Sequence, residues 1–166
     1  MLAIGIDPGT AITGYGLVRE EDDGSLTVID YGAIITSPDE PMPKRLVQLY
    51  HQLKDLLALH GPQSGAVEKL FFARNVRTAL TVGQARGVAL LALAEAGVNL
   101  AEYTPNEVKQ AVVGFGGADK SQVQKMVQAI LRMEEIPQPD DAADALAVAI
   151  CHLHSARMRS FEEKDE

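Results

Sequence analysis

The chain alternates between short apolar runs and longer stretches whose apolar residues recur at helical spacing. The runs typical of β-strands cover residues 2–6, 13–19, 26–36, 64–68 and 98–103. Helical spacing extends over about 46–57 and 75–96, over the segments that follow Thr104 and Asp119, and over about 140–154. Three strands followed by alternating helices and strands predict an α/β domain with a mixed five-stranded sheet flanked by helices.

The residues at the predicted helix ends support these boundaries. Pro41 and Pro43 stand at the start of the first helix, and Gly61 follows its end. Thr104 is followed three residues later by Glu107, which is the pattern of a capping box. Asp119 can cap the helix that follows it.

The length of 166 residues suits one domain that buries its core without disulfides. We expect residues 1–155 to form this domain and residues 156–166 to form an acidic, disordered tail. Cys151 lies in an apolar helical run, which favours a buried, unreactive thiol in a reducing compartment. The N-terminus has no basic leader, and the longest apolar stretch, 88–94, is too short to cross a bilayer. These features predict a cytoplasmic protein without a membrane span.

The formal charge of −8 is unevenly distributed along the chain. Acidic residues dominate 19–40 and the end of the chain from residue 161. Between residues 68 and 132, however, eight Lys and Arg outnumber five Asp and Glu. A nucleic-acid-binding face in this middle region is therefore permitted, although an ordinary solvated mixture of charges explains the same counts.

Carboxylates end two of the predicted strands and begin the last helix. Asp7 and Glu68 each follow a buried apolar run, and ligands of α/β sheets gather beyond such strand ends. Asp144 shares a helix face with both Asp140 and Asp141, so spacing alone does not choose between those two. The aspartates also have ordinary explanations, because Asp favours turns and helix N-termini. Glu68 is less easily explained in this way, because Glu is a poor residue to end an apolar strand. Their combination nevertheless indicates one shared site.

An oxygen-only set of ligands favours Mg²⁺, with Mn²⁺ as a substitute, and disfavours zinc. Two such ions, about 3.5–4 Å apart, activate water and stabilise the leaving oxygen when a phosphodiester is cut. The predicted chemistry is therefore phosphoryl transfer.

Across roughly residues 1–154 the sequence resembles the RuvC family of bacterial Holliday junction resolvases. The matching segments are GIDPGT at 5–10, GYG at 14–16, VEKLFFARN at 67–75, GQARGVA at 83–89, VKQAVVG at 108–114, ADKSQVQ at 118–124 and DAADALAVAICH at 141–152. The resemblance implies a ribonuclease H-like fold and a structure-specific endonuclease. It also implies Mg²⁺-dependent, paired nicks in four-way DNA junctions during recombination and repair.

The resemblance selects Asp141 over Asp140 and implies that Asp7, Glu68, Asp141 and Asp144 are the catalytic metal ligands. It further implies a homodimer that works with the helicase proteins RuvA and RuvB. On the segment from residue 75, Ala79, Gly83 and Gly87 form a ridge of small residues that suits close approach of another helix, although packing on the sheet explains it equally well.

The resemblance also implies residues that contact DNA. Phe71 is expected to stack on bases at the crossover, and Lys109 and Lys120 are expected to hold phosphates. Lys69, Arg74 and Arg77 flank the strand that ends at Glu68, and we expect them to extend this basic track.

Two other functions compete with this interpretation. The segment DPGT at 7–10 resembles the phosphate loop of the actin and sugar-kinase superfamily, but that class needs two such lobes and this chain has one loop. The other alternative is a nucleic-acid-binding module of the same fold without catalysis. The complete set of four carboxylates argues against it.

Overall fold

The computed structural model describes residues 1–69 and 75–162, with side chains up to residue 159. Its described part contains a mixed sheet of five strands in the order β3-β2-β1-β4-β5. The strands are β1 (Leu2–Asp7), β2 (Ile12–Glu20), β3 (Leu26–Ile35), β4 (Ser64–Glu68) and β5 (Asn99–Tyr103). The first three form an antiparallel meander, whereas β1, β4 and β5 run parallel. The predicted sheet is confirmed.

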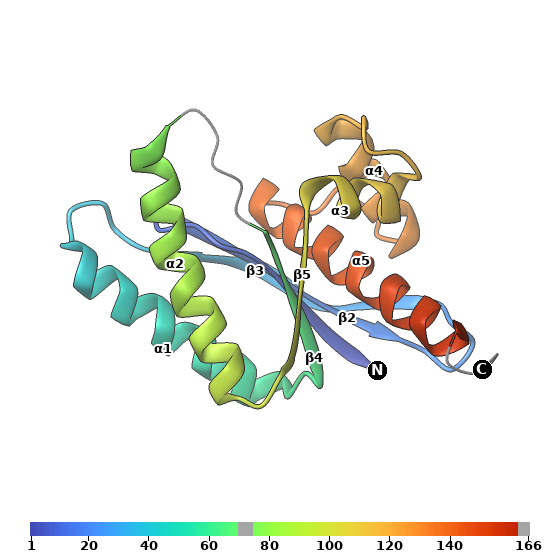
Figure 1. The fold of residues 1–166 in the computed structure, drawn as a ribbon, viewed down its shortest axis with the longest axis horizontal. Helices are drawn as coiled ribbons and strands as arrows, with labels where there is room; N and C mark the ends of the chain where they lie inside the picture. The colour runs from blue at the N-terminus through green and yellow to red at the C-terminus, as the bar shows by residue number, and fades with distance from the viewer. Residues whose placement is uncertain (70–74, 163–166) are drawn as a thin grey trace.

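Helices cover both faces of the sheet (Figure 1). They are α1 (Met42–His60), α2 (Val76–Glu95), α3 (Pro105–Val113), α4 (Lys120–Ile130) and α5 (Asp140–Glu162). Helices α1 and α2 pack on one face, and α3, α4 and α5 pack on the other. The last helix continues to Glu162, so residues 156–162 are helical where the sequence predicted a disordered tail. The division into a domain and a tail at residue 155 stays a prediction.

Strand alternation assigns each residue of β1 to one of the two cores. Ile4 and Ile6 are fully buried in the core beneath α1 and α2. Ala3 belongs to the core beneath α5, and Gly5 and Asp7 follow on that same face because side chains alternate along a strand. Asp7 therefore emerges under α5, at the end of the central strand.

Glycines let the backbone of α5 lie directly on the sheet. A Cβ atom at Gly5 would stand 2.1 Å from the carbonyl oxygen of Ala145, and one at Gly16 would stand 2.9 Å from the Cα of Leu146. Gly5 and Gly16 are opposite one another in the β1–β2 ladder. No larger residue fits at Gly5 unless α5 moves, so this pair fixes the height of the helix above the sheet.

The predicted caps are present. Thr104 and Glu107 form the capping box at the start of α3, and Asp119 caps α4. Gly61 ends α1 in the left-handed conformation, with a φ of 56°. None of the helices in the described ranges combines the length and apolar character needed to cross a bilayer.

The buried polar residues of α5 have structural roles. His152 lies between the Tyr103 hydroxyl, 3.0 Å from its Nδ1, and the Ser64 hydroxyl, 2.9 Å from its Nε2. This network connects α5 to the ends of β5 and β4. Burial raises the pKa of the Cys151 thiol to about 11, which agrees with the predicted unreactive cysteine.

Leu53 of α1 is fully buried, whereas Leu59 on the same helix is 77% exposed. We expect Leu53→Ala to lower the free energy of unfolding by about 2–5 kcal/mol, because it removes a buried side chain and leaves a cavity. Leu59→Ala should change it by no more than about 0.5 kcal/mol. Urea unfolding measures both, and equal losses in the two variants would contradict the described packing.

Candidate functional site

Two carboxylates meet at the end of the parallel part of the sheet. Strands β1 and β4 are neighbours, with Ile6 opposite Val67. Asp7 and Glu68 are the next residues of these strands, and both lie on the face covered by α5. Parallel pairing therefore brings side chains 61 residues apart in sequence to one edge.

The first turn of α5 supplies two more carboxylates. Gly14 is opposite Asp7 in the β1–β2 ladder, and a Cβ atom at Gly14 would stand 1.9 Å from the carbonyl oxygen of Asp141. The start of α5 therefore rests on β2 directly beside Asp7. Asp141 and Asp144 are both half-buried, and the charge of each acts on Asp7.

Asp140 differs from its neighbour Asp141. It is exposed, and its carboxylate accepts a hydrogen bond of 3.1 Å from the Gln124 amide and lies 3.5 Å from Lys120 Nζ. Asp140 is the first residue of α5, and its side chain contacts residues of α4. Asp140 therefore differs from Asp141 in exposure and in contacts, and the choice of Asp141 as the site residue stays a prediction.

The four carboxylates act on one another electrostatically. Burial, and then the negative charges of Asp144 and Glu68, raise the pKa of Asp7 from its ordinary 3.8 to about 7, and Asp141 adds to this effect. Burial and the charge of Asp144 raise the pKa of Glu68 in the same way. Burial also raises the pKa of Asp144, although Lys120 opposes the change. Such a cluster favours binding of a proton or a cation.

A pocket of about 240 Å³ opens beside these residues. It is lined by Asp7, Glu68 and Asp144, and by two lysines, Lys109 of α3 and Lys120 of α4. Lys120 Nζ donates a hydrogen bond of 3.2 Å to Asp144 Oδ2. The charge of Lys109 partly offsets the rise in the pKa of Glu68. Both predicted phosphate-binding lysines therefore adjoin the carboxylates.

The other predicted DNA-binding residues lie at the periphery or outside the described chain. Lys69 is exposed directly after β4, and its backbone N–H donates to the Tyr103 carbonyl at 2.7 Å. Arg77 is exposed in the first turn of α2. Phe71 and Arg74 lie outside the described residues.

Sequence reasoning missed Arg86 of α2. Its guanidinium pairs with the carboxylate of Glu102 on β5, and its Nε lies 3.5 Å from the backbone carbonyl of Glu68. Arg86 therefore ties α2 to the strand ends that carry the site. No local pattern could have found it, because its partners come from two other elements.

Comparison with known proteins identifies the family. The family model described as crossover junction endodeoxyribonuclease RuvC matches residues 3–152. The chain belongs to the RuvC family. Crossover junction endodeoxyribonuclease RuvC of Syntrophomonas wolfei is 57% identical over 163 residues, which cover 98% of this chain and 94% of that protein.

Solved RuvC structures share the fold. Thermus thermophilus RuvC superposes with a TM-score of 0.88 at 40% identity, and the match covers 95% of this chain and 96% of that one. T. thermophilus RuvC in complex with a Holliday junction substrate gives a TM-score of 0.87 at 37% identity with the same coverage. The expected ribonuclease H-like fold is confirmed.

The RuvC-family chain offers a donor set that fits a hard divalent cation. All four side chains are carboxylates, and their mutual repulsion is relieved by positive charge. Within residues 1–69 and 75–162, no three His, Cys, Asp or Glu side chains stand close enough together to hold an ion as they are. The Lys120 contact directs Asp144 toward α4. Cation binding therefore requires the carboxylates to close around the ion.

The raised pKa of Asp7 predicts how stability depends on pH when divalent ions are chelated. The folded protein keeps the proton on Asp7 up to about pH 7, whereas the unfolded chain loses it near 3.8. The free energy of unfolding should therefore fall as pH rises between these values, by about 1–3 kcal/mol. Asp7→Asn should lack this part of the decline and be more stable than the parent at pH 8.

Urea unfolding in EDTA at pH 5 and pH 8 measures this difference. Asp39→Asn, at an exposed position, serves as the matched control and should follow the parent. If Asp7→Asn lost as much stability as the parent between the two pH values, Asp7 would not be a carboxyl group whose pKa is raised by burial and neighbouring negative charges.

Proposed function

We propose that this RuvC-family endodeoxyribonuclease hydrolyses phosphodiester bonds of four-way DNA junctions at Asp7, Glu68, Asp141 and Asp144. The carrying observation is the convergence of these carboxylates, since burial, and then the charges of Asp144, Glu68 and Asp141, raise the pKa of Asp7 to about 7. The complex of T. thermophilus RuvC with a Holliday junction substrate supports the choice of substrate. No observation of the site favours the nucleotide-binding or the non-catalytic alternative.

The cofactor in this proposal is Mg²⁺, with Mn²⁺ as a substitute and two ions per site. The four carboxylates hold the ions, which supply charge stabilisation and an activated water when bound. Asp141 and Asp144 are half-buried, so salt and water would screen their attraction to a cation less than that of fully exposed carboxylates. The contact of the α5 backbone with Gly14 keeps the first turn of this helix beside Asp7, so that its carboxylates can close around an ion.

Replacing any one of the four carboxylates by its amide should abolish junction cleavage, with a loss of at least about 100-fold, because an amide holds a cation less well. Junction binding should be largely retained. Quantifying nicks on a synthetic four-way junction with Mg²⁺, alongside gel-shift titration, measures both properties. The matched control is Asp140→Asn, which should keep most of the activity. Retained cleavage in two of the four variants would contradict the assignment.

The basic residues near the pocket supply the DNA contacts in this proposal. Lys109 and Lys120 line the pocket and are suited to the phosphates that flank the cut. Exposed Lys69 and Arg77 extend the track, and Arg74 belongs with them. Phe71 is proposed to stack on bases at the crossover, which is worth about 1–3 kcal/mol per base.

Lys109→Ala and Lys120→Ala should each weaken junction binding and make its salt dependence shallower, by about 0.9 in the slope of log K against log salt per lost phosphate contact. The expected cause is the loss of counterion release. Binding isotherms at several salt concentrations measure the slope. Lys44→Ala, on α1 and paired with Glu40, is the control and should leave it unchanged. Unchanged slopes in both test variants would exclude direct phosphate contacts.

Paired, symmetric cleavage requires two sites, and we assign the homodimer contact to α2. Val76, Leu80 and Leu91 of this helix each expose more than half of their surface. A Cβ atom at exposed Gly87 would meet nothing within 4 Å, so another helix could approach closely there. Apolar side chains on one helix are suited to an interface between copies. We further propose that the protein works with RuvA and RuvB, and that it acts in the cytoplasm during DNA recombination and repair.

Leu80→Glu should raise the dimer dissociation constant by at least about tenfold, because it introduces a charge into an apolar contact. Sedimentation equilibrium across micromolar concentrations measures this constant. Leu59→Glu makes the same change at an exposed leucine of α1 and should leave the dimer intact. A dimer that survives Leu80→Glu unchanged would rule out the α2 contact.

A further inference from the structure

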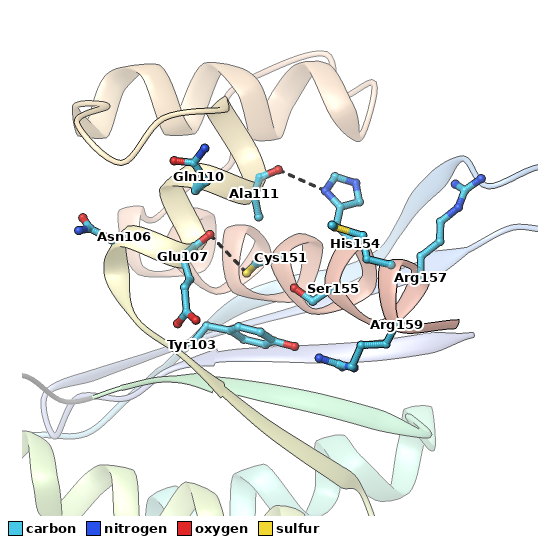
Figure 2. A pocket seen from close by; sticks show the side chains of 11 residues that line it. Tyr103, Asn106, Glu107, Gln110, Ala111, Cys151, His154, Ser155, Arg157 and Arg159 are labelled. Carbon is cyan, nitrogen blue, oxygen red and sulfur yellow. Dashed lines mark hydrogen bonds between the residues drawn. The ribbon is translucent and has the colours of Figure 1, made fainter. Parts of the chain in front are cut away.

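A second and larger cavity lies on the same side of the sheet as the carboxylates. It has a volume of about 860 Å³ and runs between α3 and the C-terminal half of α5 (Figure 2). Among the described residues, none lines both this groove and the carboxylate pocket. Helix α3 separates the two, because Val108 and Lys109 face the pocket while Glu107 and Ala111 face the groove. The groove is therefore a distinct surface.

The walls of the groove are spaced to receive another helix. On α3, Glu107 and Ala111 are four residues apart, and on α5, Cys151, Ser155 and Met158 are separated by four and three residues. Such spacings form ridges that a third helix packs against. The exposed surface of the lining is mainly apolar, and Met158 exposes 65% of its surface there. Apolar anchors at helical spacing fill grooves of this type.

The charges around the groove are predominantly positive. Arg157 and Arg159 of α5 line it, against one carboxylate, Glu107 of α3. That carboxylate accepts the Thr104 backbone N–H at 2.7 Å, so it is engaged in capping α3. Arg159 extends toward Tyr103 at the base of the groove (Figure 2). An incoming helix that carries Asp or Glu beside its apolar stripe complements this lining.

We propose that the groove between α3 and the end of α5 binds an acidic, amphipathic helix of a partner protein. This surface lies beyond the nuclease site and does not depend on it. Burial raises the pKa of Cys151 to about 11, so the thiol offers packing surface rather than a covalent bond.

DNA is the less suitable occupant. A duplex carries charge along its whole length and gains little from an apolar floor. Arg157 lies 3.5 Å from the carbonyl oxygen of Gly24, next to the acidic turn at residues 20–23. A stiff polyanion that follows the groove would meet this turn, whereas a short helix can place its few carboxylates at Arg159 and away from it.

The test uses the full chain and a synthetic amphipathic peptide of about 16 residues, with Leu at helical spacing and Glu on the flanks. A second peptide has Lys in place of every Glu. Fluorescence anisotropy measures affinity, and amide chemical shifts locate the bound peptide. The Glu peptide should bind at residues of α3 and α5 at least about tenfold more tightly than the Lys peptide.

Two groove variants and one control complete the experiment. Met158→Glu and Arg159→Glu should each lower the affinity for the Glu peptide by at least about tenfold. Leu59→Glu, on the opposite face, should bind like the parent. All three should keep their junction cleavage, which separates failure of this proposal from failure of the nuclease assignment.

Four results would overturn the proposal. Equal affinity for the two peptides would show that the charges of the groove do not select the peptide. Unchanged affinity in both groove variants would show that the peptide binds at another surface. Displacement of the peptide from α3 and α5 by a short DNA duplex would make the groove a nucleic-acid surface. An altered dimer constant in Met158→Glu would instead make it a contact between copies of this chain.

Discussion

Direct contact between the backbone of α5 and the β1–β2 ladder is the constraint on which the site depends. Gly5, Gly14 and Gly16 leave no side chain between the strands and the helix. The first turn of α5 therefore lies beside the end of β1, and Asp141 and Asp144 share one edge with Asp7. A methyl group at Gly14 would push this turn away, since it would overlap the Asp141 carbonyl. The packing that positions α5 on the sheet therefore also positions Asp141 and Asp144 beside Asp7.

The same packing makes the site electrostatically costly. Desolvation and like charges raise the pKa values of Asp7 and Glu68, so these groups oppose folding when they are ionised. Lys120 offsets part of this cost through its contact with Asp144. A divalent cation would offset more of it, because it carries two charges and binds oxygen directly. Strain of this kind is expected at a site shaped for a ligand rather than for stability.

Much of the fold and part of the site could be predicted from local patterns. Asp7 and Glu68 were recognised because each ends an apolar run, and parallel strands bring such ends together. Asp140 and Asp141 could not be separated from sequence spacing, because both share a helix face with Asp144, and their different exposure and contacts depend on how α5 packs on α4 and the sheet. Arg86 was missed for the same reason. The groove could not be predicted from the sequence either, because Glu107 and Met158 come together only when α3 packs on α5. These features depend on packing between residues far apart in the sequence, which local propensities do not reveal.

The central claim is that folding gathers four carboxylates into a site for divalent cations. Crystals of the full chain soaked in Mn²⁺ test it most directly, through anomalous difference density. The account predicts density at the ends of β1 and β4, with oxygens of Asp7 and Glu68 within about 2.3 Å of an ion and α5 carboxylates completing the site. Well-ordered carboxylates that remain apart, with no density between them at saturating Mn²⁺, would contradict it.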